Sequence, residues 1–340
     1  MSNSTTTAKT AILFLHAQTS LHPGSGTALG TVDLPVQRER HTCWPLIPGS
    51  ALKGILRDAC REKAKERYSD EYGEKQEQGH TKRVLTRSRR KAANEDDPLL
   101  VAAFGPGRIT GEGSHTGAIS LTDARILAFP VRSLKGVFAW VTCPAVLGRL
   151  ARDLELAGHP CPEGLPEFNS EKCEQALCPE GSPLLLVEGP AKKLVLEEFE
   201  FTRVGDPGSL PVWLADHAVS DAFTKSRLND HVVVLQDDDF SHFVRHATEV
   251  VARIGLDYEK KTVKDGALFY QEFLPPETLF YSLVFATDSR FANHRASAAE
   301  MLDYVAATVR ERKVLQVGGD ETTGKGLCAV TLHAAQEIAR

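Results

Sequence analysis

One acid stands between spaced glycines and a basic cluster in the segment SGTALGTVDLPVQRERHT, which runs from Ser25 to Thr42. The acid is Asp33, and the basic residues Arg38 and Arg40 follow it closely. A carboxylate is an anion at neutral pH, so beside a polyanion it must recruit a cation or face a hydroxyl. In RNA that hydroxyl is the 2′-OH, whose in-line attack on the adjacent phosphate requires loss of its proton. The pattern suggests a loop that lies on an RNA backbone; the alternative for Asp33 is a turn residue that hydrogen-bonds its own backbone.

A second cationic group follows in GSALKGILR. Ser50 is a suitable N-cap for a helix in which apolar residues recur at helical spacing. The free N–H groups and positive dipole end of that helix, with Lys53 and Arg57 one turn apart, suit the binding of phosphates. The alternative is that Lys53 and Arg57 form only the polar face of an amphipathic helix.

The C-terminal stretch GGDETTGKG imitates a nucleotide-binding loop. Residues 319–325 have the spacing of such a loop, but Gly326 replaces the Ser or Thr that should hold Mg²⁺. A strand pattern, LCAVTLH, then follows where a helix is required. A nucleotide hydrolase using residues 319–326 is therefore the weaker hypothesis, and a turn that holds a phosphodiester is the stronger one. The residues predicted to hold it are Gly318, Gly319, Gly324 and Lys325.

The elements that must position these residues alternate along the chain. Strands are predicted at 11–19, 117–129, 136–143 and 278–287 and on either side of VGGDETTGKG. Helices are predicted to begin at Ser50 and at Pro144 and to span 293–310. A further helix is predicted from a cap at Asp237, with an apolar face that extends to Val251. Mixed order of this kind predicts an α+β fold of antiparallel sheet and helices, of which the ferredoxin-like fold is the simplest member. We treat residues 1–340 as a single domain with insertions.

Two segments differ from this pattern. Residues 69–98 are highly charged, and 81–91 carry six Lys or Arg and no acid, so 69–98 is predicted to be a flexible insertion. Residues 183–201 contain two strand-like runs around Gly189-Pro190 and are predicted to form a hairpin.

The composition of the chain limits the classes of protein to which it can belong. The net charge of −5 argues against sequence-blind coating of nucleic acid but permits a local basic groove. No apolar run approaches the roughly 20 residues of a membrane span, and the N-terminus lacks a secretory pattern, so we expect a cytoplasmic protein. Seven cysteines fit a reducing compartment. Zinc at Cys161, Cys173 and Cys178 is the less favoured reading, because their spacing contains no Cys-x-x-Cys pair.

Five blocks in order carry a resemblance over nearly the whole chain. They are LHPGSGTALGTVDLPVQRERHT, PLIPGSALKGILRD, FPVRSLKGVFAWVTCP, FLPPETLFYSL and LQVGGDETTGKG. Together they resemble the repeated backbone subunit of the type III-B CRISPR effector, the Cmr complex, within the RAMP superfamily. The resemblance implies a modified ferredoxin-like (RRM-like) palm with an inserted helical region and a β-hairpin thumb, for which 183–201 is the candidate.

The resemblance also implies function. It implies copies stacked in a helical filament along a CRISPR guide RNA, alongside other Cmr subunits, with each copy cutting the paired target RNA. It assigns cleavage to Asp33, with Mg²⁺ or a similar divalent cation held transiently there, and places a supporting acid at Glu272. His22 is a weaker candidate for general base, since an unperturbed imidazole titrates near neutrality. The main rival hypothesis is a catalytically silent RNA-binding filament subunit.

Overall fold

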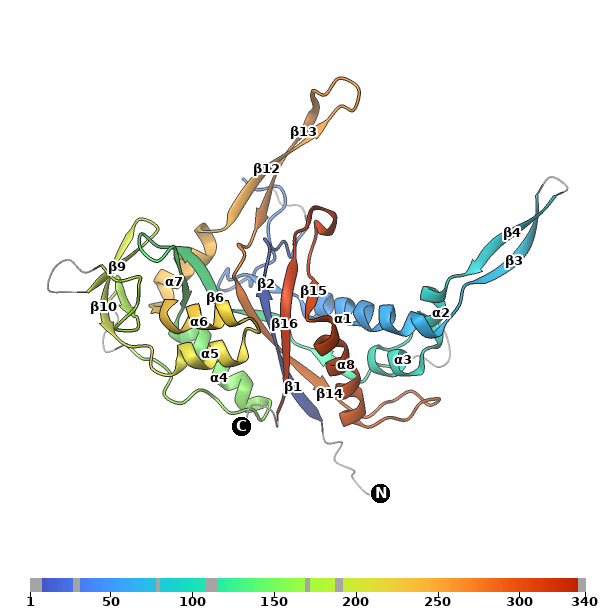
Figure 1. Cartoon of the computed structure of the whole chain (residues 1–340), viewed down its shortest axis with the longest axis horizontal. Coiled ribbons are helices and arrows are strands. Elements are labelled where there is room, and N and C mark those ends of the chain that lie inside the picture. Colours follow the sequence, from blue (N-terminus) through green and yellow to red (C-terminus); the bar gives the residue numbers. More distant parts are fainter. Residues whose placement is uncertain are drawn as a thin grey trace.

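The computed structural model describes residues 8–26, 31–77, 80–107, 115–168, 172–186 and 192–335. Within these ranges twelve strands form one sheet: β1 (Lys9–Ala17), β2 (Leu46–Ile47), β5 (Ile119–Leu121), β6 (Ala124–Arg132), β7 (Phe138–Thr142), β8 (Gln175–Leu177), β9 (Lys193–Leu196), β10 (Phe199–Gly205), β11 (Val232–Leu235), β14 (Leu279–Ala286), β15 (Val314–Gln316) and β16 (Leu327–Ala334). Two separate ribbons, β3 (Glu71–Glu77) with β4 (His80–Arg87) and β12 (Glu249–Leu256) with β13 (Val263–Phe273), project from the body (Figure 1). The helices are α1 (Gly49–Ala64), α2 (Arg89–Asp96), α3 (Pro98–Phe104), α4 (Pro144–Leu156), α5 (Leu210–His217), α6 (Ala222–His231), α7 (Asp237–His246) and α8 (Ala298–Arg312). No helix in this part of the chain is both long and apolar enough to cross a bilayer.

The centre of the sheet has the strand order β16-β1-β14-β6, and all its neighbours are antiparallel. Along the chain α1 follows β1, and α8 connects β14 to β16. Residues 11–15 of β1 are fully buried, because β1 is central and both of its faces are covered. Helix α8 contacts α1, β1 and β14, and on α5 Trp213 packs edge-on against Phe14. The observed class is α+β, as the sequence predicted.

Helix α1 begins one residue earlier than predicted. Its N-cap is Pro48, and Ser50 lies inside the first turn without making a capping bond. The amide of Gly49 instead donates to Asp123 Oδ1 at 2.7 Å, so a distant carboxylate supplies the cap. A side chain at Gly49 would lie 2.7 Å from the Leu121 carbonyl oxygen, which explains the glycine.

The segment 69–98 is regular, contrary to the prediction of a flexible insertion. It contains the β3–β4 ribbon and helix α2. Arg87 anchors the ribbon through ion pairs with Glu95 at 3.1 Å and Asp96 at 2.7 Å. Both faces of the ribbon are exposed, so its strands lack the apolar alternation by which sequence reveals them.

The segment 183–201 does not project in its described part. Strands β9 and β10 join the main sheet through a turn at Glu197 and Glu198, and Leu194, Leu196 and Phe201 are buried. Gly189 and Pro190, around which the hairpin was predicted, lie outside the described residues. The projecting hairpin on this half of the chain is β12–β13 instead.

The helix predicted from Asp237 ends earlier than its apolar stripe suggested. The N-cap of α7 is Gln236, and Asp237 Oδ1 accepts the Ala145 amide at 2.9 Å, so its carboxylate connects α7 to α4. Val251, predicted on the helix face, lies in β12 and is 41% exposed. The apolar residues of β12 therefore continue the helical spacing of α7 only by coincidence.

A buried histidine follows α4. His159 is 4% exposed, and neither ring nitrogen has a hydrogen-bond partner among the described residues. Burial, with a smaller effect of His333, lowers its pKa from 6.5 to about 4. The unfolded chain binds this proton near pH 6.5 and the folded chain only near pH 4, so the stabilising contribution of His159 is complete above pH 6.5 and is lost as the pH falls toward 4.

We therefore expect the free energy of unfolding to fall by about 2 kcal/mol between pH 7.5 and pH 5 through this group alone. Urea denaturation at the two pH values measures the difference. In His159→Leu the pH dependence should be correspondingly smaller, whereas His242→Gln, at an exposed position, should leave it intact. Equal slopes for wild type and His159→Leu would contradict the assignment.

Candidate nucleic-acid interface

Asp33 lies at the base of the β12–β13 ribbon. Its side chain is exposed, and Oδ2 accepts the backbone N–H of Tyr270 at 2.7 Å. The following residue, Leu34, pairs with β13: its N–H donates to the Tyr270 carbonyl at 3.0 Å, and its carbonyl accepts the Glu272 N–H at 3.0 Å. The hydrogen bond of Asp33 thus goes to a strand far away in sequence and not to its own turn. Oδ1 has no hydrogen-bond partner among the described residues.

Glu272 supports this segment from inside. It is 6% exposed, and its carboxylate accepts the Val36 N–H at 3.0 Å and the Thr248 hydroxyl at 2.9 Å. Arg38 Nη2 completes the set at 2.5 Å from Oε1. Each carboxylate oxygen of Glu272 thus accepts at least one hydrogen bond from the fold, and these bonds hold the segment that follows Asp33 in place. The predicted supporting role is therefore a positioning one.

Arg38 is committed to the fold. Besides Glu272, its Nη1 donates to the carbonyls of Cys43 at 2.8 Å and Val244 at 2.9 Å. These contacts leave the guanidinium poorly placed for the phosphate contact that the sequence suggested. Arg40, two residues on, is exposed and makes no polar side-chain contact with the described residues, so it remains available to an anion.

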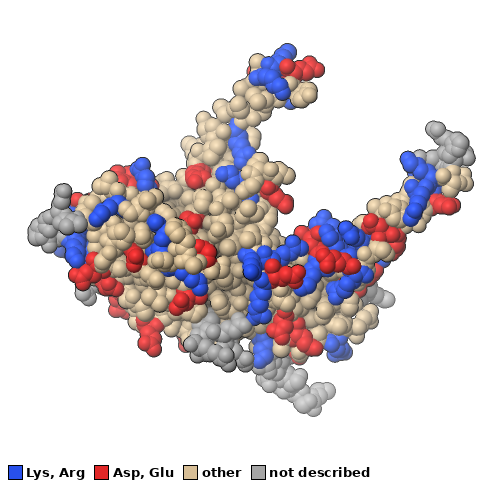
Figure 2. All heavy atoms as spheres, in the orientation of Figure 1, with Lys and Arg blue, Asp and Glu red and all other residues tan. Residues whose placement is uncertain are grey.

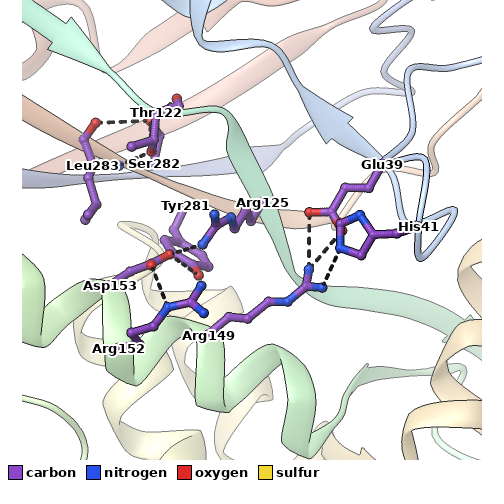
Figure 3. A network of polar contacts seen from close by, with 10 residues as sticks. All are labelled: Glu39, His41, Thr122, Arg125, Arg149, Arg152, Asp153, Tyr281, Ser282 and Leu283. Carbon is purple, nitrogen blue, oxygen red and sulfur yellow. Dashed lines mark hydrogen bonds and ion pairs between the residues drawn. The ribbon is translucent and has the colours of Figure 1, made fainter.

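The short loop that carries Arg40 is fixed by α4 (Figure 3). Arg149 Nη1 binds Glu39 Oε2 at 2.9 Å, and Nη2 lies 3.2 Å from His41 Nε2. The same guanidinium lies 4.7 Å from the ring centroid of Trp44. Burial alone would raise the pKa of Glu39, but the hydrogen bonds from Thr42 and Arg149 hold it below its usual value. The loop therefore presents Arg40 and His41 from a rigid base.

Helix α4 is itself bound to the sheet by the second network in Figure 3. Asp153 accepts hydrogen bonds from Arg125 of β6 and from the Tyr281 hydroxyl of β14. Burial, with the neighbouring Asp153 carboxylate, raises the pKa of Tyr281. This buried contact fixes α4, and through Arg149 the loop, relative to the central strands.

His22 is a structural residue. It is 8% exposed, its Nδ1 donates to the Glu272 carbonyl at 2.7 Å, and its ring packs on Phe273 with centroids 5.5 Å apart. Its own carbonyl accepts the Gly319 N–H at 3.0 Å. The proton-transfer role considered for His22 is not supported by this buried, engaged geometry.

The glycine-rich loop between β15 and β16 packs against the same ribbon base. Strand β16 follows it directly, after a 3₁₀ turn at Glu321–Thr323, so the helix that a nucleotide-binding loop needs is missing here. Gly319 and Gly324 are exposed. Lys325 Nζ lies 3.2 Å from Ser20 Oγ and 5.2 Å from the Phe273 ring centroid. The loop thus offers exposed backbone and a half-buried cation beside the Asp33 segment.

Gly318 is required by the approach of this loop to His22. Its φ is +79°, and a Cβ would lie 2.2 Å from the His22 carbonyl oxygen. We expect Gly318→Ala to lower the free energy of unfolding by about 1–2 kcal/mol from backbone strain alone, with the clash adding to it. Thermal denaturation measures the loss. Gly148→Ala is the control, because open space surrounds that helical glycine and helix propensity favours alanine; equal melting temperatures for Gly318→Ala and wild type would contradict the expectation.

The two basic residues of α1 that were predicted to contact phosphate lie in different environments. Ser50 is exposed and Lys53 is half-buried, and burial with the nearby Arg57 lowers the pKa of Lys53. Arg57 donates to Asn94 Oδ1 at 3.1 Å and to the Gly105 carbonyl at 2.9 Å, so it fastens the insertion to α1. Lys53 remains a candidate for phosphate contact, whereas Arg57 has a structural task.

Sequence reasoning missed the ribbon residues at this site. Tyr270, Gln271 and Arg253 lie on β12–β13, and Asp320 lies in the glycine-rich loop. They come together only through the tertiary fold: Gln271 Nε2 donates to Asp320 Oδ2 at 2.6 Å, and Arg253 Nη2 is 3.3 Å from Asp320 Oδ1. Asp320 lies in the glycine-rich motif and Gln271 precedes Glu272, but nothing in the sequence showed that these two regions meet.

A resident metal cage is not formed by the described residues. No three His, Cys, Asp or Glu side chains among them come together to hold a metal ion. This includes Cys161 and Cys173, which are exposed, and Cys178, which is buried. At the candidate site Asp33 offers one uncommitted oxygen, and a divalent cation there would need most of its ligands from water and RNA, a mode that Mg²⁺ commonly adopts.

Comparisons with known proteins agree with this description. The family model of the RAMP superfamily matches residues 14–329. A Pyrococcus furiosus protein described as the CRISPR system Cmr endoribonuclease Cmr4 is 37% identical over 330 residues, covering 95% of this chain and 96% of that protein. A Saccharolobus solfataricus protein, the CRISPR system CMR subunit Cmr4, is 24% identical over 92% of this chain and 93% of its own length.

Solved structures give the same result. The crystal structure of oligomeric Cmr4 from Pyrococcus furiosus has a TM-score of 0.63 and 29% identity, covering 96% of this chain and 98% of that one. A chain of the type III-B Cmr-beta complex bound to cognate target RNA has a TM-score of 0.65 at 19% identity, covering 98% of each chain, which is a likeness of fold. From the family match and the identity over almost its full length, this chain belongs to the RAMP superfamily.

Proposed function

We propose that this chain is the repeated backbone subunit of a type III-B CRISPR ribonucleoprotein and that it cleaves target RNA paired to the guide. The observation that carries the proposal is the position of Asp33: an exposed carboxylate at the base of the ribbon, with Oδ2 held by the Tyr270 N–H and one uncommitted oxygen. The 37% identical relative is described as an endoribonuclease, which supports the same activity here. Base pairing would supply sequence specificity and the protein the backbone grip. The partners would be guide RNA, target RNA, further copies of the chain and other Cmr subunits in the cytoplasm.

The chemistry follows from the placement of Asp33. The hydrogen bond from the Tyr270 N–H holds Oδ2, and Oδ1 would face the ribose of a bound RNA. There it would accept the 2′-OH proton as the 2′-oxygen attacks the phosphorus and the 5′-oxygen leaves. The products would be a 2′,3′-cyclic phosphate, or the 3′-phosphate from its hydrolysis, and a 5′-hydroxyl. When bound at Asp33, a divalent cation would neutralise charge on the phosphate.

The strand order β16-β1-β14-β6, with α1 and α8 as its crossover helices, supports a modified ferredoxin-like palm. On this palm the β12–β13 ribbon is the better thumb candidate than 183–201, because it projects from the body (Figure 1). Its tip carries the exposed Tyr258 beside Lys260 and Lys261, among neighbouring acids (Figure 2). Aromatic and cationic side chains together suit a single-stranded nucleic acid.

The thumb assignment predicts an effect on RNA binding. Lys260→Glu with Lys261→Glu should weaken target binding by the assembled complex severalfold, most strongly at low salt, because two phosphate contacts are lost. Filter binding across a salt series measures it. The same double change at Lys192 and Lys193, on the β9 side, should have little effect; the reverse result would restore 183–201 as the thumb.

End mapping in a reconstituted complex tests the function itself. A labelled target paired to the guide should be cut at regular intervals, once for each copy of the chain, with 5′-hydroxyl and cyclic-phosphate ends. Chelation by EDTA should stop cutting, and Mg²⁺ should restore it. A complex that binds target with normal affinity but leaves it intact would identify the chain as a silent filament subunit.

A further inference from the structure

The glycine-rich loop and the Asp33 segment both contact the same strand, β13. Asp33 and Leu34 are bonded to Tyr270 and Glu272 of β13, and Gln271 lies between those two residues. Successive side chains of a strand point to opposite faces, so Gln271 points away from its two neighbours. Its side chain is 4% exposed, and its Nε2 donates to Asp320 Oδ2 at 2.6 Å. The glycine-rich loop and the Asp33 carboxylate therefore contact adjacent residues of β13, Gln271 and Tyr270.

Asp320 occupies the junction of the two features. Its backbone has a left-handed φ of +64°, and its carbonyl accepts the N–H groups of Thr323 at 3.0 Å and Lys325 at 3.2 Å, which closes the loop. Its carboxylate binds the ribbon twice, through Gln271 of β13 and through Arg253 of β12. Arg253 in turn lies 5.4 Å from the ring centroid of Phe273. Figure 1 shows the β15–β16 loop beside the ribbon base, where these contacts form.

We propose that Asp320 is a positioning residue that couples the loop holding the RNA backbone to the carboxylate that cuts it. The inference rests on the proposed function. In this proposal Asp320 does not contact the reacting atoms. It holds β13, and therefore Tyr270, in a fixed position relative to the glycine-rich loop. The Tyr270 N–H in turn orients Asp33. A displacement of about 1 Å in a reacting group can reduce a rate by about 100-fold. An RNA strand bound to the glycine-rich loop would then lie at a fixed distance from Asp33.

Single-turnover cleavage by the assembled complex at saturating target tests the coupling. Asp320→Ala should slow cleavage about tenfold or more while target affinity changes by less than about twofold. Asp320→Asn keeps an acceptor for Gln271 and should recover most of the rate. Gln271→Ala should also slow cleavage, and the double variant should be no slower than Asp320→Ala alone, because Asp320→Ala has already removed the contact with Gln271. A merely structural role would lower stability without this rescue and non-additivity.

Glu321→Ala is the matched control, since Glu321 is the exposed neighbour in the same loop and its side chain makes no polar contact with the described residues. Wild-type cleavage by Asp320→Ala, or equal loss in Glu321→Ala, would overturn the inference. An Asp33→Asn complex run in parallel separates the two hypotheses. If Asp33→Asn is inactive and Asp320→Ala is normal, only the coupling fails; if Asp33→Asn cuts normally, the proposed function fails.

Discussion

Asp33→Asn is expected to reduce target cleavage by the assembled complex by about 100-fold or more, since a positioned proton acceptor typically contributes at least that factor. The amide oxygen can still accept the Tyr270 N–H, so the loop should keep its conformation. Guide binding, filament assembly and target affinity should therefore be unchanged. Single-turnover cleavage with a labelled target measures the rate, and native gel electrophoresis measures assembly.

Two outcomes would separate the alternatives. Unchanged cutting would remove Asp33 from the chemistry and with it the proposed mechanism. Loss of cutting together with loss of assembly would show that the residue is needed for structure. Glu277→Gln is a useful control: Glu277 is another acid with one short contact, to His16 at 2.6 Å, but that contact lies elsewhere on the sheet. Its substitution should leave the cleavage rate intact.

Arg38→Met is expected to destabilise the chain by about 3 kcal/mol or more, because it leaves the Glu272 carboxylate buried without its cation. Three hydrogen bonds of the guanidinium are lost at the same time. The Val36 segment is then less firmly held, so cleavage should fall as well. Chemical denaturation measures the first effect, and single-turnover assays at a permissive temperature measure the second.

Arg40→Met is the matched control, since it removes the same charge two residues away from an exposed position. It should preserve the free energy of unfolding and weaken RNA binding in a salt-dependent manner. If Arg38→Met unfolds like the wild type and loses only RNA affinity, the phosphate contact suggested by the sequence is the correct role for Arg38. The two substitutions thus test which of the neighbouring arginines faces the nucleic acid.

The elements predicted well from sequence are those with at least one buried face. Helix α4 begins at Pro144 as expected, and its buried residues Val146, Leu147 and Leu150 form the predicted stripe. Strands β1 and β14 are apolar throughout because they lie at the centre of the sheet. In these segments local pattern and tertiary environment agree, so the sequence was sufficient.

The failures have a common physical cause. Ribbons β3–β4 and β12–β13 expose both faces, so burial imposes no alternation on them. The sequence placed Arg38 and Arg57 on RNA, whereas the structure also gives them intramolecular partners, Glu272 and Asn94, that are remote in sequence. A cation on a helix or loop looks the same in sequence whether it meets a phosphate or a carbonyl. The role predicted for Asp33 came from the family resemblance, whereas Asp320, although it lies in the glycine-rich motif, received no role from the sequence.

The hydrogen bond from Tyr270 to Asp33 joins residues separated by 237 positions, and β1 needs β14 and β16 on its two sides. Non-local contacts of this kind form late in folding. The ribosome must therefore synthesise the chain through β13 before Tyr270 can hold the Asp33 carboxylate. A premature stop upstream of β13 would remove the Tyr270 N–H, so the truncated chain would lack this candidate site.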